Sequence, residues 1–235
     1  MKPHITTRIL LIAALAGGAL AEESKEAERL KEAALVLGEI MGAPDEAIPG
    51  DLLERAECVA VIPALKKAAF GIGGRYGRGA VSCRTGEKGA GPWGPPSMLT
   101  VGGGSFGLQL GGQSSDVVFL VMNRNGINHL VKSKFTIGGD ASAAAGPKGR
   151  SAAAATDITM RAEILTYART RGLFAGVSLD GAVVKPDVDG NKNLYGKAVD
   201  AKKLLVEGGI GAPAAAQPFL TALTKYAPRN VSAKK

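Results

Sequence analysis

The sequence predicts an α+β fold in which an antiparallel, barrel-like β body lies between an N-terminal helical segment and C-terminal helices. Apolar residues recur at helical spacing over residues 22–42. From Cys58 onward the period changes, and short apolar runs alternate with glycine or proline, as in strands joined by turns. Helical patterns return over residues 198–206 and 214–226.

These patterns divide the chain into one domain with flanking segments. We expect a single domain over 22–228, made of a helical segment (22–57), a β body (58–185) and a helical C-terminal part (186–228). The last residues, 229–235, are expected to form a disordered tail.

The first 21 residues resemble an export signal. Lys2 and Arg8 supply positive charge, Ile9–Ala16 is a short apolar run, and Ala19-Leu-Ala21 has the small-x-small form of a cleavage site. An uncleaved anchor or an ordinary first helix is the alternative, but the apolar run is short for a bilayer span. We therefore expect 1–21 to be a signal peptide and the product to be periplasmic or secreted, and peripherally associated with a membrane.

Residues 22–42 have an apolar stripe opposite a charged face. Such a helix can lie on a membrane or pack against the rest of its own domain. Residues 22–57 carry a net charge of −7, which suits an anionic lipid surface poorly. The pattern therefore favours packing on the β body.

The β body is predicted to have about eight strands. Glycine is common where a backbone turns or approaches another chain segment closely, so the glycine-rich blocks between the runs are interpreted as turns. The strand-like runs are 59–62, 69–72, 80–83, 98–101, 106–110, 117–122, 135–137 and 173–179.

The two cysteines, Cys58 and Cys83, lie in two of these strand-like runs. An exported protein works in an oxidising compartment, where a disulfide between neighbouring strands can form and persist. The sequence therefore predicts a Cys58–Cys83 disulfide, with two separately buried thiols as the alternative.

The glycine-rich motifs do not give a convincing enzyme or cofactor site. Gly102-x-Gly104-x-x-Gly107 matches a dinucleotide fingerprint and Gly103-x-Ser105-x-Gly107 matches an esterase elbow, but both need a helix to follow, and the next residues resemble a strand and a turn. His129 is the one histidine after residue 21 that could act as a base. We predict no enzyme and no cofactor, and keep a Ser105 esterase as the less favoured alternative.

No metal site is predicted either. One histidine and two cysteines beyond residue 21 do not supply a zinc ligand set. Residues 187–193 resemble a calcium loop, but glycine is fourth rather than sixth and the twelfth residue is Ala198, so a tight turn is favoured.

Positive charge is concentrated after Cys58, where residues 58–235 carry a net charge of +13. Exposed amides in glycine turns can bind anions, and a flanking cation adds attraction; solvated loop charge is the alternative. Nucleic-acid binding would need interleaved aromatic residues, which are scarce here. The candidate anion-binding residues are Lys66, Lys67, Arg75, Arg78, Lys148, Arg150, Arg169 and Arg171.

Several motifs in this order resemble the SYLF domain family, also called the Ysc84 actin-binding domain. The resemblance covers roughly residues 25–225 and implies lipid binding without catalytic residues. In eukaryotic members it implies phosphoinositide and actin binding, with membrane contact through the N-terminal helix. The motifs are Ala64–Gly79, Pro92–Pro96, Gly102–Asp116, Gly146–Arg150 and Gly172–Gly181.

Together these observations give two hypotheses. The first is an exported, non-catalytic protein that binds an anionic phospholipid membrane surface, with a phosphoinositide-type headgroup implied by the resemblance. The second is a structural or interaction protein of the cell envelope that binds an acidic protein or glycan; the sequence identifies no particular protein partner.

Overall fold

A computed structural model of the 235-residue chain describes residues 24–43, 48–70, 72–86, 89–106, 111–147, 161–170, 173–176 and 179–228. The predicted signal peptide (1–21) and tail (229–235) lie outside these ranges, so both remain predictions.

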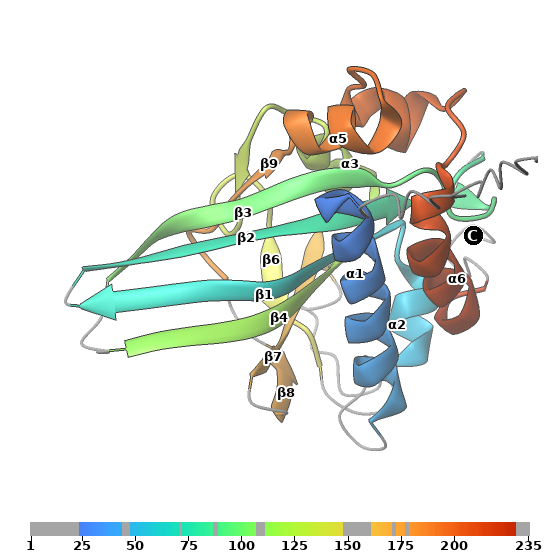
Figure 1. Cartoon of the computed structure of the whole chain (residues 1–235). Helices are drawn as coiled ribbons and strands as arrows, with labels where there is room; N and C mark the ends of the chain where they lie inside the picture. The colour runs from blue at the N-terminus through green and yellow to red at the C-terminus, as the bar shows by residue number, and fades with distance from the viewer. Residues whose placement is uncertain are drawn as a thin grey trace, which may run out of the picture.

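Within the described ranges, the strands form one curled sheet in the order β5-β9-β3-β2-β1-β4-β7-β6, with β8 paired to β7. Pairing is antiparallel except between β6 and β7. The sheet forms a half-barrel with helices beside it, which confirms the predicted α+β class (Figure 1). The strands are β1 (Cys58–Phe70), β2 (Ile72–Cys83), β3 (Ser97–Phe106), β4 (Gly111–Val121), β5 (Phe135–Thr136), β6 (Ala143–Ala145), β7 (Ile164–Thr170), β8 (Leu173–Gly176) and β9 (Val183–Pro186).

The central strands are longer than predicted. The runs 69–72 and 80–83 were expected to be separate strands, but β1 ends at Phe70, β2 starts at Ile72, and β2 continues without a break to Cys83. Gly77 and Gly79 lie inside β2 at positions where their neighbours leave no room for a side chain. A Cβ at Gly79, for example, would overlap the backbone of Val61.

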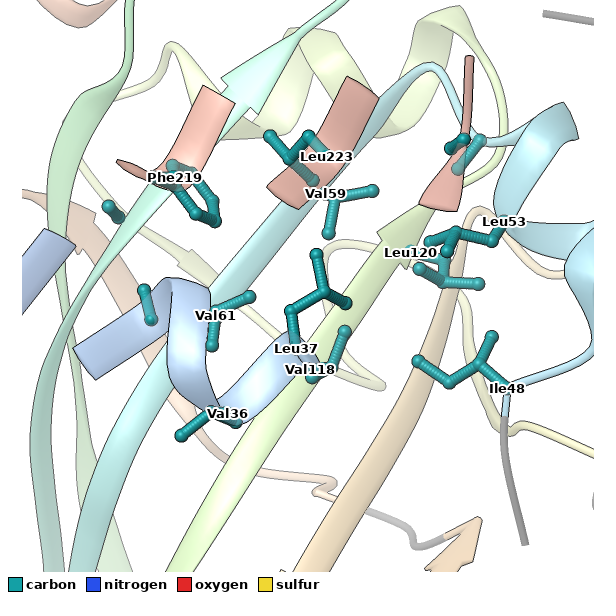
Figure 2. Close-up of a cluster of buried hydrophobic side chains, with 14 of the residues drawn as sticks. Val36, Leu37, Ile48, Leu53, Val59, Val61, Val118, Leu120, Phe219 and Leu223 are labelled. Atoms are coloured by element: carbon teal, nitrogen blue, oxygen red, sulfur yellow. The ribbon is translucent and has the colours of Figure 1, made fainter. Parts of the chain in front are cut away.

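The N-terminal helix packs on the sheet, as its apolar stripe predicted. Ser24 caps α1, accepting a hydrogen bond from the amide of Ala27 at 3.2 Å. Leu30, Leu37 and Ile40 are buried, and Leu37 lies among side chains from the sheet and from α6 (Figure 2). The helices are α1 (Lys25–Gly42), α2 (Gly50–Arg55), α3 (Arg124–Leu130), α5 (Val188–Tyr195) and α6 (Gln217–Tyr226), with a π-helical turn at Lys203–Glu207 and a 3₁₀ turn at Ala214–Ala216.

Alternating residues of the central strands serve two hydrophobic cores. Val59 and Val61 of β1 join the core beneath α1, α2 and α6. Ala60 and Ile62 face the opposite, concave side and join a second core with residues of β3, β4 and β9. Because both faces are covered here, this part of the sheet is largely apolar.

We call this doubly covered half of the four central strands the base, and the other half the arm. The base comprises 58–62, 78–83, 97–101 and 117–121. The arm comprises 65–70, 72–77, 102–106 and 111–116. A register irregularity between Ile62 and Leu65 separates the two halves of β1.

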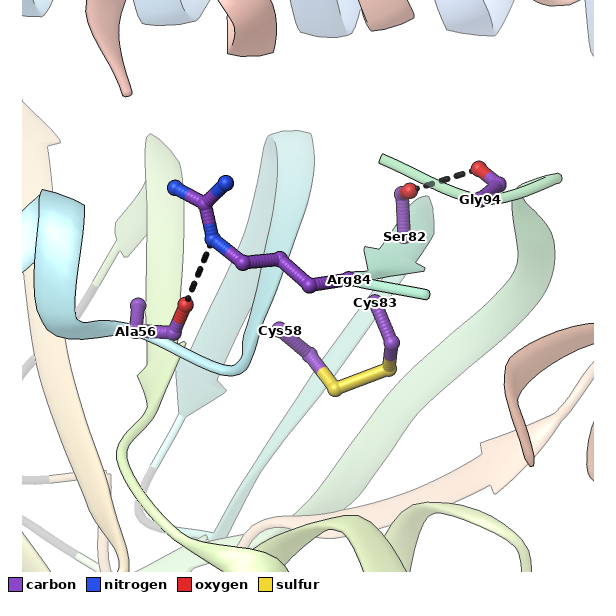
Figure 3. The surroundings of a disulfide bond; sticks show 6 residues. All are labelled: Ala56, Cys58, Ser82, Cys83, Arg84 and Gly94. Atoms are coloured by element: carbon purple, nitrogen blue, oxygen red, sulfur yellow. Dashed lines mark hydrogen bonds between the residues drawn. A yellow bond between two sulfur atoms is a disulfide. The ribbon is translucent and has the colours of Figure 1, made fainter. Parts of the chain in front are cut away.

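The base contains the predicted disulfide. Cys58 and Cys83 are cross-strand partners and are bonded (Figure 3). Arg84, the residue after the bridge, is buried and donates hydrogen bonds to the carbonyls of Ala56 at 3.4 Å and Ala227 at 2.8 Å. Its guanidinium also lies 4.2 Å from the Trp93 ring centroid, and burial lowers the pKa of Arg84.

Candidate anion-binding site on the arm

The arm extends beyond the helices that cover the base (Figure 1). Helix α1 crosses the sheet at the boundary between base and arm. Its first turn approaches β2, where Glu26 lies 4.0 Å from Arg78, and its last turn reaches β7, where Glu39 pairs with Arg169. Among the described residues, no helix covers the two faces of the arm beyond this crossing in the way that helices enclose the base.

Arg78, a predicted anion-binding residue, forms an ion pair with a carboxylate of the protein itself. Its Nε donates to Oδ2 of Asp187 at 2.7 Å, and the Asp187 side chain is only 8% exposed. Partial burial alone would lower the pKa of Arg78, but the hydrogen bond and charge of Asp187 raise it. This ion pair joins β2 to the N-terminus of α5, so Arg78 has a structural role.

Arg169 is also paired with carboxylates of the protein. Its Nη2 donates to Oδ2 of Asp116 at 2.7 Å, and it also pairs with Glu39 of α1. Burial opposes the charged form, yet these two carboxylates raise the pKa of Arg169. The second oxygen of Asp116 accepts the backbone amide of Ala64 at 3.0 Å, so this cluster links α1 to the irregularity in β1.

Three other predicted cations lie at two neighbouring levels of the arm, one on one face of the β1–β2 pair and two on the other. Lys66 is paired across the strands with Tyr76, and Lys67 is paired directly with Arg75. Lys66 is exposed, while Lys67 and Arg75 are half-buried. In the part of the chain that the structure describes, none of the three forms a salt bridge.

The Lys67–Arg75 pair is electrostatically unfavourable without an anion. Like charges directly opposite each other on two strands repel. The Nε of Arg75 is buried and has no hydrogen-bond partner among the described residues, which leaves a donor unsatisfied. An anionic group at this position would relieve both costs.

The remaining predicted cations, Lys148, Arg150 and Arg171, lie outside the described residues. The eight candidates therefore divide into two that form internal ion pairs, three on the arm and three that stay predictions. The five that are described lie within strands β1, β2 and β7 rather than in turns, because the glycine-rich blocks beside them are strand segments.

Sequence reasoning missed Tyr76 as part of this cluster. Its side chain is 57% exposed and lies opposite Lys66 on the arm. The signal was available in the sequence, because Tyr76 is an aromatic residue between Arg75 and Gly77 in a glycine-rich stretch with few large side chains to cover it. Exposed tyrosines combine an apolar ring with a polar tip, as residues at membrane interfaces do.

The esterase alternative finds no support in the geometry. Ser105 lies within strand β3, paired with Gly73 in the arm, and Phe106 after it is still in the strand, whereas the elbow places its serine at a sharp turn from strand to helix. His129 lies on α3, which begins three residues after the opposite, base end of β4. Ten strand positions along β2 and β4, or about 33 Å, separate the level of Ser105 from that end.

The predicted turn after Asp187 is a helix instead. Asp187 is the N-cap of α5 and accepts the amide of Gly190 at 3.0 Å, while its other oxygen is held by Arg78. The described residues contain no cluster of three potential metal ligands. None of the helices among them is long and apolar enough to span a bilayer.

Comparison with known proteins identifies the family. The family Ysc84, described as "Las17-binding protein actin regulator", matches residues 102–226. This chain belongs to the Ysc84, or SYLF, family. The match confirms the resemblance seen in the glycine-rich motifs.

Named relatives support this assignment. An SH3 domain-containing protein of Schizosaccharomyces pombe is 34% identical over 207 residues, covering 87% of this chain and 47% of the relative. LAS seventeen-binding protein 3 of Saccharomyces cerevisiae is 33% identical over 218 residues, covering 90% of this chain and 46% of the relative. SH3 domain-containing YSC84-like protein 1 of Bos taurus is 30% identical over 202 residues, covering 83% of this chain and 58% of the relative. The chain thus spans about half the length of these relatives.

Proposed function

We propose that this chain is a non-catalytic binding module that attaches reversibly to anionic phospholipid membranes through the arm. The single observation that carries the proposal is the group of Lys66, Lys67 and Arg75, three cations that lie at two neighbouring levels of the arm without an ion-pair partner among the described residues. The unsatisfied Nε of Arg75 supports it further.

The position of these cations suits an end-on approach to a membrane. Lys66 lies on one face of the two-stranded segment and Lys67 and Arg75 on the other, because neighbouring strand residues alternate. An arm that meets the surface with its end brings both faces within a Debye length of the headgroups. Each cation contributes about 1 kcal/mol near an anionic surface, so the three contribute about 3 kcal/mol.

The test compares two triple variants of equal charge change. The variant Lys66→Glu/Lys67→Glu/Arg75→Glu reverses the charge of the three arm cations. The control variant reverses the charge of three exposed lysines elsewhere. The arm variant is expected to lose about two orders of magnitude in vesicle partitioning in co-sedimentation, and the control much less. The control positions are Lys192, Lys197 and Lys225.

Two outcomes would contradict the proposal. Equal binding of the wild type to neutral and anionic vesicles, without salt dependence, would exclude an electrostatic attachment. An equal loss in both triple variants would show that net charge alone drives binding and that the arm is not the site. A panel of vesicles with different headgroups, including phosphoinositides, would then identify the preferred lipid.

We also propose that the module is exported after removal of residues 1–21. The disulfide in the base supports an oxidising compartment. Expression of the full chain in a secreting host, followed by mass determination of the product, is expected to show a new N-terminus at Glu22. Recovery of the intact chain in the cytosolic fraction, with Cys58 and Cys83 reduced, would contradict export.

A second candidate function is binding to a protein partner, because the family is described as a Las17-binding actin regulator. The same basic arm could attract an acidic protein surface. Under this alternative the wild type would not sediment with vesicles but would retain a partner or actin filaments, and the arm variant would lose it.

A further inference from the structure

The segment after α5 carries a surface hollow that lies apart from the arm. In Figure 1 this segment lies over the base end of the sheet. The hollow has a volume of about 340 Å³, a size at which pockets hold small ligands or short stretches of a partner. We propose that the hollow binds an acidic peptide segment of a protein partner, through two lysines that already hold a carboxylate of this chain. This binding is independent of the proposed membrane attachment.

Two lysines at the hollow converge on one carboxylate. Nζ of Lys202 lies 3.2 Å from Oε1 of Glu207, and Nζ of Lys203 lies 3.7 Å from Oε2 of the same residue. All three residues line the hollow. The π-helical turn Lys203–Glu207 allows this arrangement, because its wider spacing brings residues five apart, such as Lys202 and Glu207, to the same side. Each carboxylate oxygen has its own ammonium group, so the hollow contains a formed carboxylate site.

The turn that carries these charges is anchored in the protein. Leu204 and Leu205 are buried in the second hydrophobic core. The amide of Gly208 donates to the carbonyl of Lys203 at 3.0 Å, and Gly208 and Gly209 have φ values of 72° and 79°, a left-handed conformation that ends the turn. Because the backbone is fixed, a ligand has to order only the outer parts of the lysine side chains. Short π-helical turns occur frequently at functional sites.

The ion pairs of Glu207 are weak enough to be exchanged for those of a ligand. The side chains of Lys202 and Glu207 are 63% and 43% exposed, and an ion pair in contact with water contributes little to stability. Three lysines and two carboxylates line the hollow, which leaves it a net positive charge. Lys197, the third lysine, forms no salt bridge among the residues that the structure describes. A carboxylate of a partner is therefore attracted to the hollow and can replace Glu207 between the two lysines.

The apolar part of the hollow favours a peptide over a membrane surface. Val199 and Ile210 line it beside the charged residues, and both pack against the second core. An acidic side chain with an apolar neighbour matches this lining, and a peptide offers both groups at short spacing. A bilayer instead offers a broad layer of headgroups, which the arm meets first because it extends beyond the helices (Figure 1).

The first test removes the two lysines. A fluorescent peptide of alternating glutamate and leucine is titrated with the protein, and its anisotropy reports binding. Lys202→Gln/Lys203→Gln is expected to bind the peptide about tenfold more weakly than the wild type, because each lysine contributes a charge-assisted contact. The control Lys134→Gln/Lys225→Gln makes the same charge change at exposed positions elsewhere and should bind nearly as tightly as the wild type. An equal loss in both variants, or no binding by the wild type, would overturn the proposal.

The second test removes the internal competitor. Glu207→Gln leaves Lys202 and Lys203 without their carboxylate, so this variant is expected to bind the peptide about threefold more tightly than the wild type. A purely structural role of the ion pairs predicts no gain, because the turn would only lose contacts. Glu28→Gln makes the same charge change at an exposed position on α1 and is the control. An unchanged affinity of Glu207→Gln, or the same gain in Glu28→Gln, would contradict the exchange.

A third comparison separates the hollow from the arm. Lys66→Gln/Lys67→Gln makes the charge change on the arm, and it should keep the peptide while losing part of its vesicle binding. Lys202→Gln/Lys203→Gln should do the reverse. If the arm variant loses the peptide instead, or if anionic vesicles displace the peptide from the wild type, the hollow is not a peptide site. Failure of the wild type to sediment with anionic vesicles would contradict only the proposed membrane attachment.

Discussion

The base and the arm of the same four strands differ in how they are covered and in how their charges are paired. The base is covered on both faces, closed by the Cys58–Cys83 disulfide and packed against three helices. The arm extends beyond those helices, is rich in glycine and holds three cations that have no ion-pair partner in the described ranges. The comparison teaches that one set of strands can be enclosed by helices at one end and present cations without ion-pair partners among the described residues at the other.

The boundary between base and arm also separates the cations that are paired within the protein from those without an ion-pair partner among the described residues. Arg78 and Arg169 lie at the boundary, where Asp187, Asp116 and Glu39 neutralise them. Charges that must be partly buried are paired, since an unpaired buried charge is costly. Beyond the boundary solvent stabilises a cation, so an unpaired lysine is tolerated there.

The largest effect should come from a cavity in the base. Leu37→Ala removes a fully buried side chain between α1 and the sheet and is expected to cost about 2–5 kcal/mol in urea unfolding. Lys66→Ala on the arm should change stability by less than about 0.5 kcal/mol. Comparable costs at the two sites would remove the distinction between base and arm.

Loss of the disulfide should have the next largest effect. The bridge joins residues 25 apart, so Cys58→Ser/Cys83→Ser is expected to lower the free energy of unfolding by about 3 kcal/mol. Since the bridge lies at the other end of β1 and β2 from the arm cations, vesicle partitioning of the folded variant should stay at the wild-type level. A parallel loss of partitioning at a temperature where the variant is fully folded would contradict this separation.

A change at the boundary should have an intermediate effect. Asp116→Ala removes the acceptor of both Arg169 and the Ala64 amide, and is expected to cost about 1–2 kcal/mol. Glu32→Ala, at an exposed position within α1, is the control and should cost less than about 0.5 kcal/mol. Urea midpoints of the two variants make the comparison; equal midpoints would show that Asp116 contributes nothing.

A fourth change should stabilise the boundary slightly. Ala64 has a φ of 50°, which costs about 1–2 kcal/mol for a residue other than glycine. Ala64→Gly relieves this strain but adds unfolded-state entropy, so a net gain of about 0.5 kcal/mol is expected. Ala68 lies in the regularly paired arm and has no such strain to relieve. Ala68→Gly should therefore lower the free energy of unfolding by a similar amount, as measured by thermal unfolding. A loss at both positions would refute the assigned strain.

The smallest effect concerns pH. Burial raises the pKa of Tyr195, whose hydroxyl donates to the carbonyl of Pro96 at 2.6 Å. Above the ordinary tyrosine pKa of about 10, the unfolded chain loses this proton while the folded chain keeps it, so the free energy of unfolding falls as pH rises. Urea titrations at about pH 9 and pH 10.5 should show a smaller fall for Tyr195→Phe. An identical fall in both proteins would contradict the assignment.

The sequence predicted the base better than the arm, for a physical reason. Helical periodicity placed α1 and its buried stripe, and two cysteines in strand-like runs gave the correct disulfide. In the arm glycine has no side chain, so the alternation that marks a strand is missing. Residues 72–83 therefore resembled turns between short strands although they form one strand.

The pairing of the arginines could not be predicted either. Arg78 and Asp187 are 109 residues apart in sequence, and Arg169 and Asp116 are 53 apart. No local pattern connects residues so distant, since their contact depends on strand order. The sequence therefore could not separate the two arginines that form internal ion pairs from the three arm cations, and the anion site itself stays a prediction.

The irregularity at Ala64 has a geometric consequence for a membrane-bound molecule. An interruption of this kind bends a strand and sets its direction, and here Asp116, Arg169 and Glu39 tie that bend to α1. If the arm meets a membrane as proposed, the bend sets the tilt of the base relative to the bilayer. The eight residues from Ile62 to Phe70 span about 26 Å, so the base is held about that far from the end of β1.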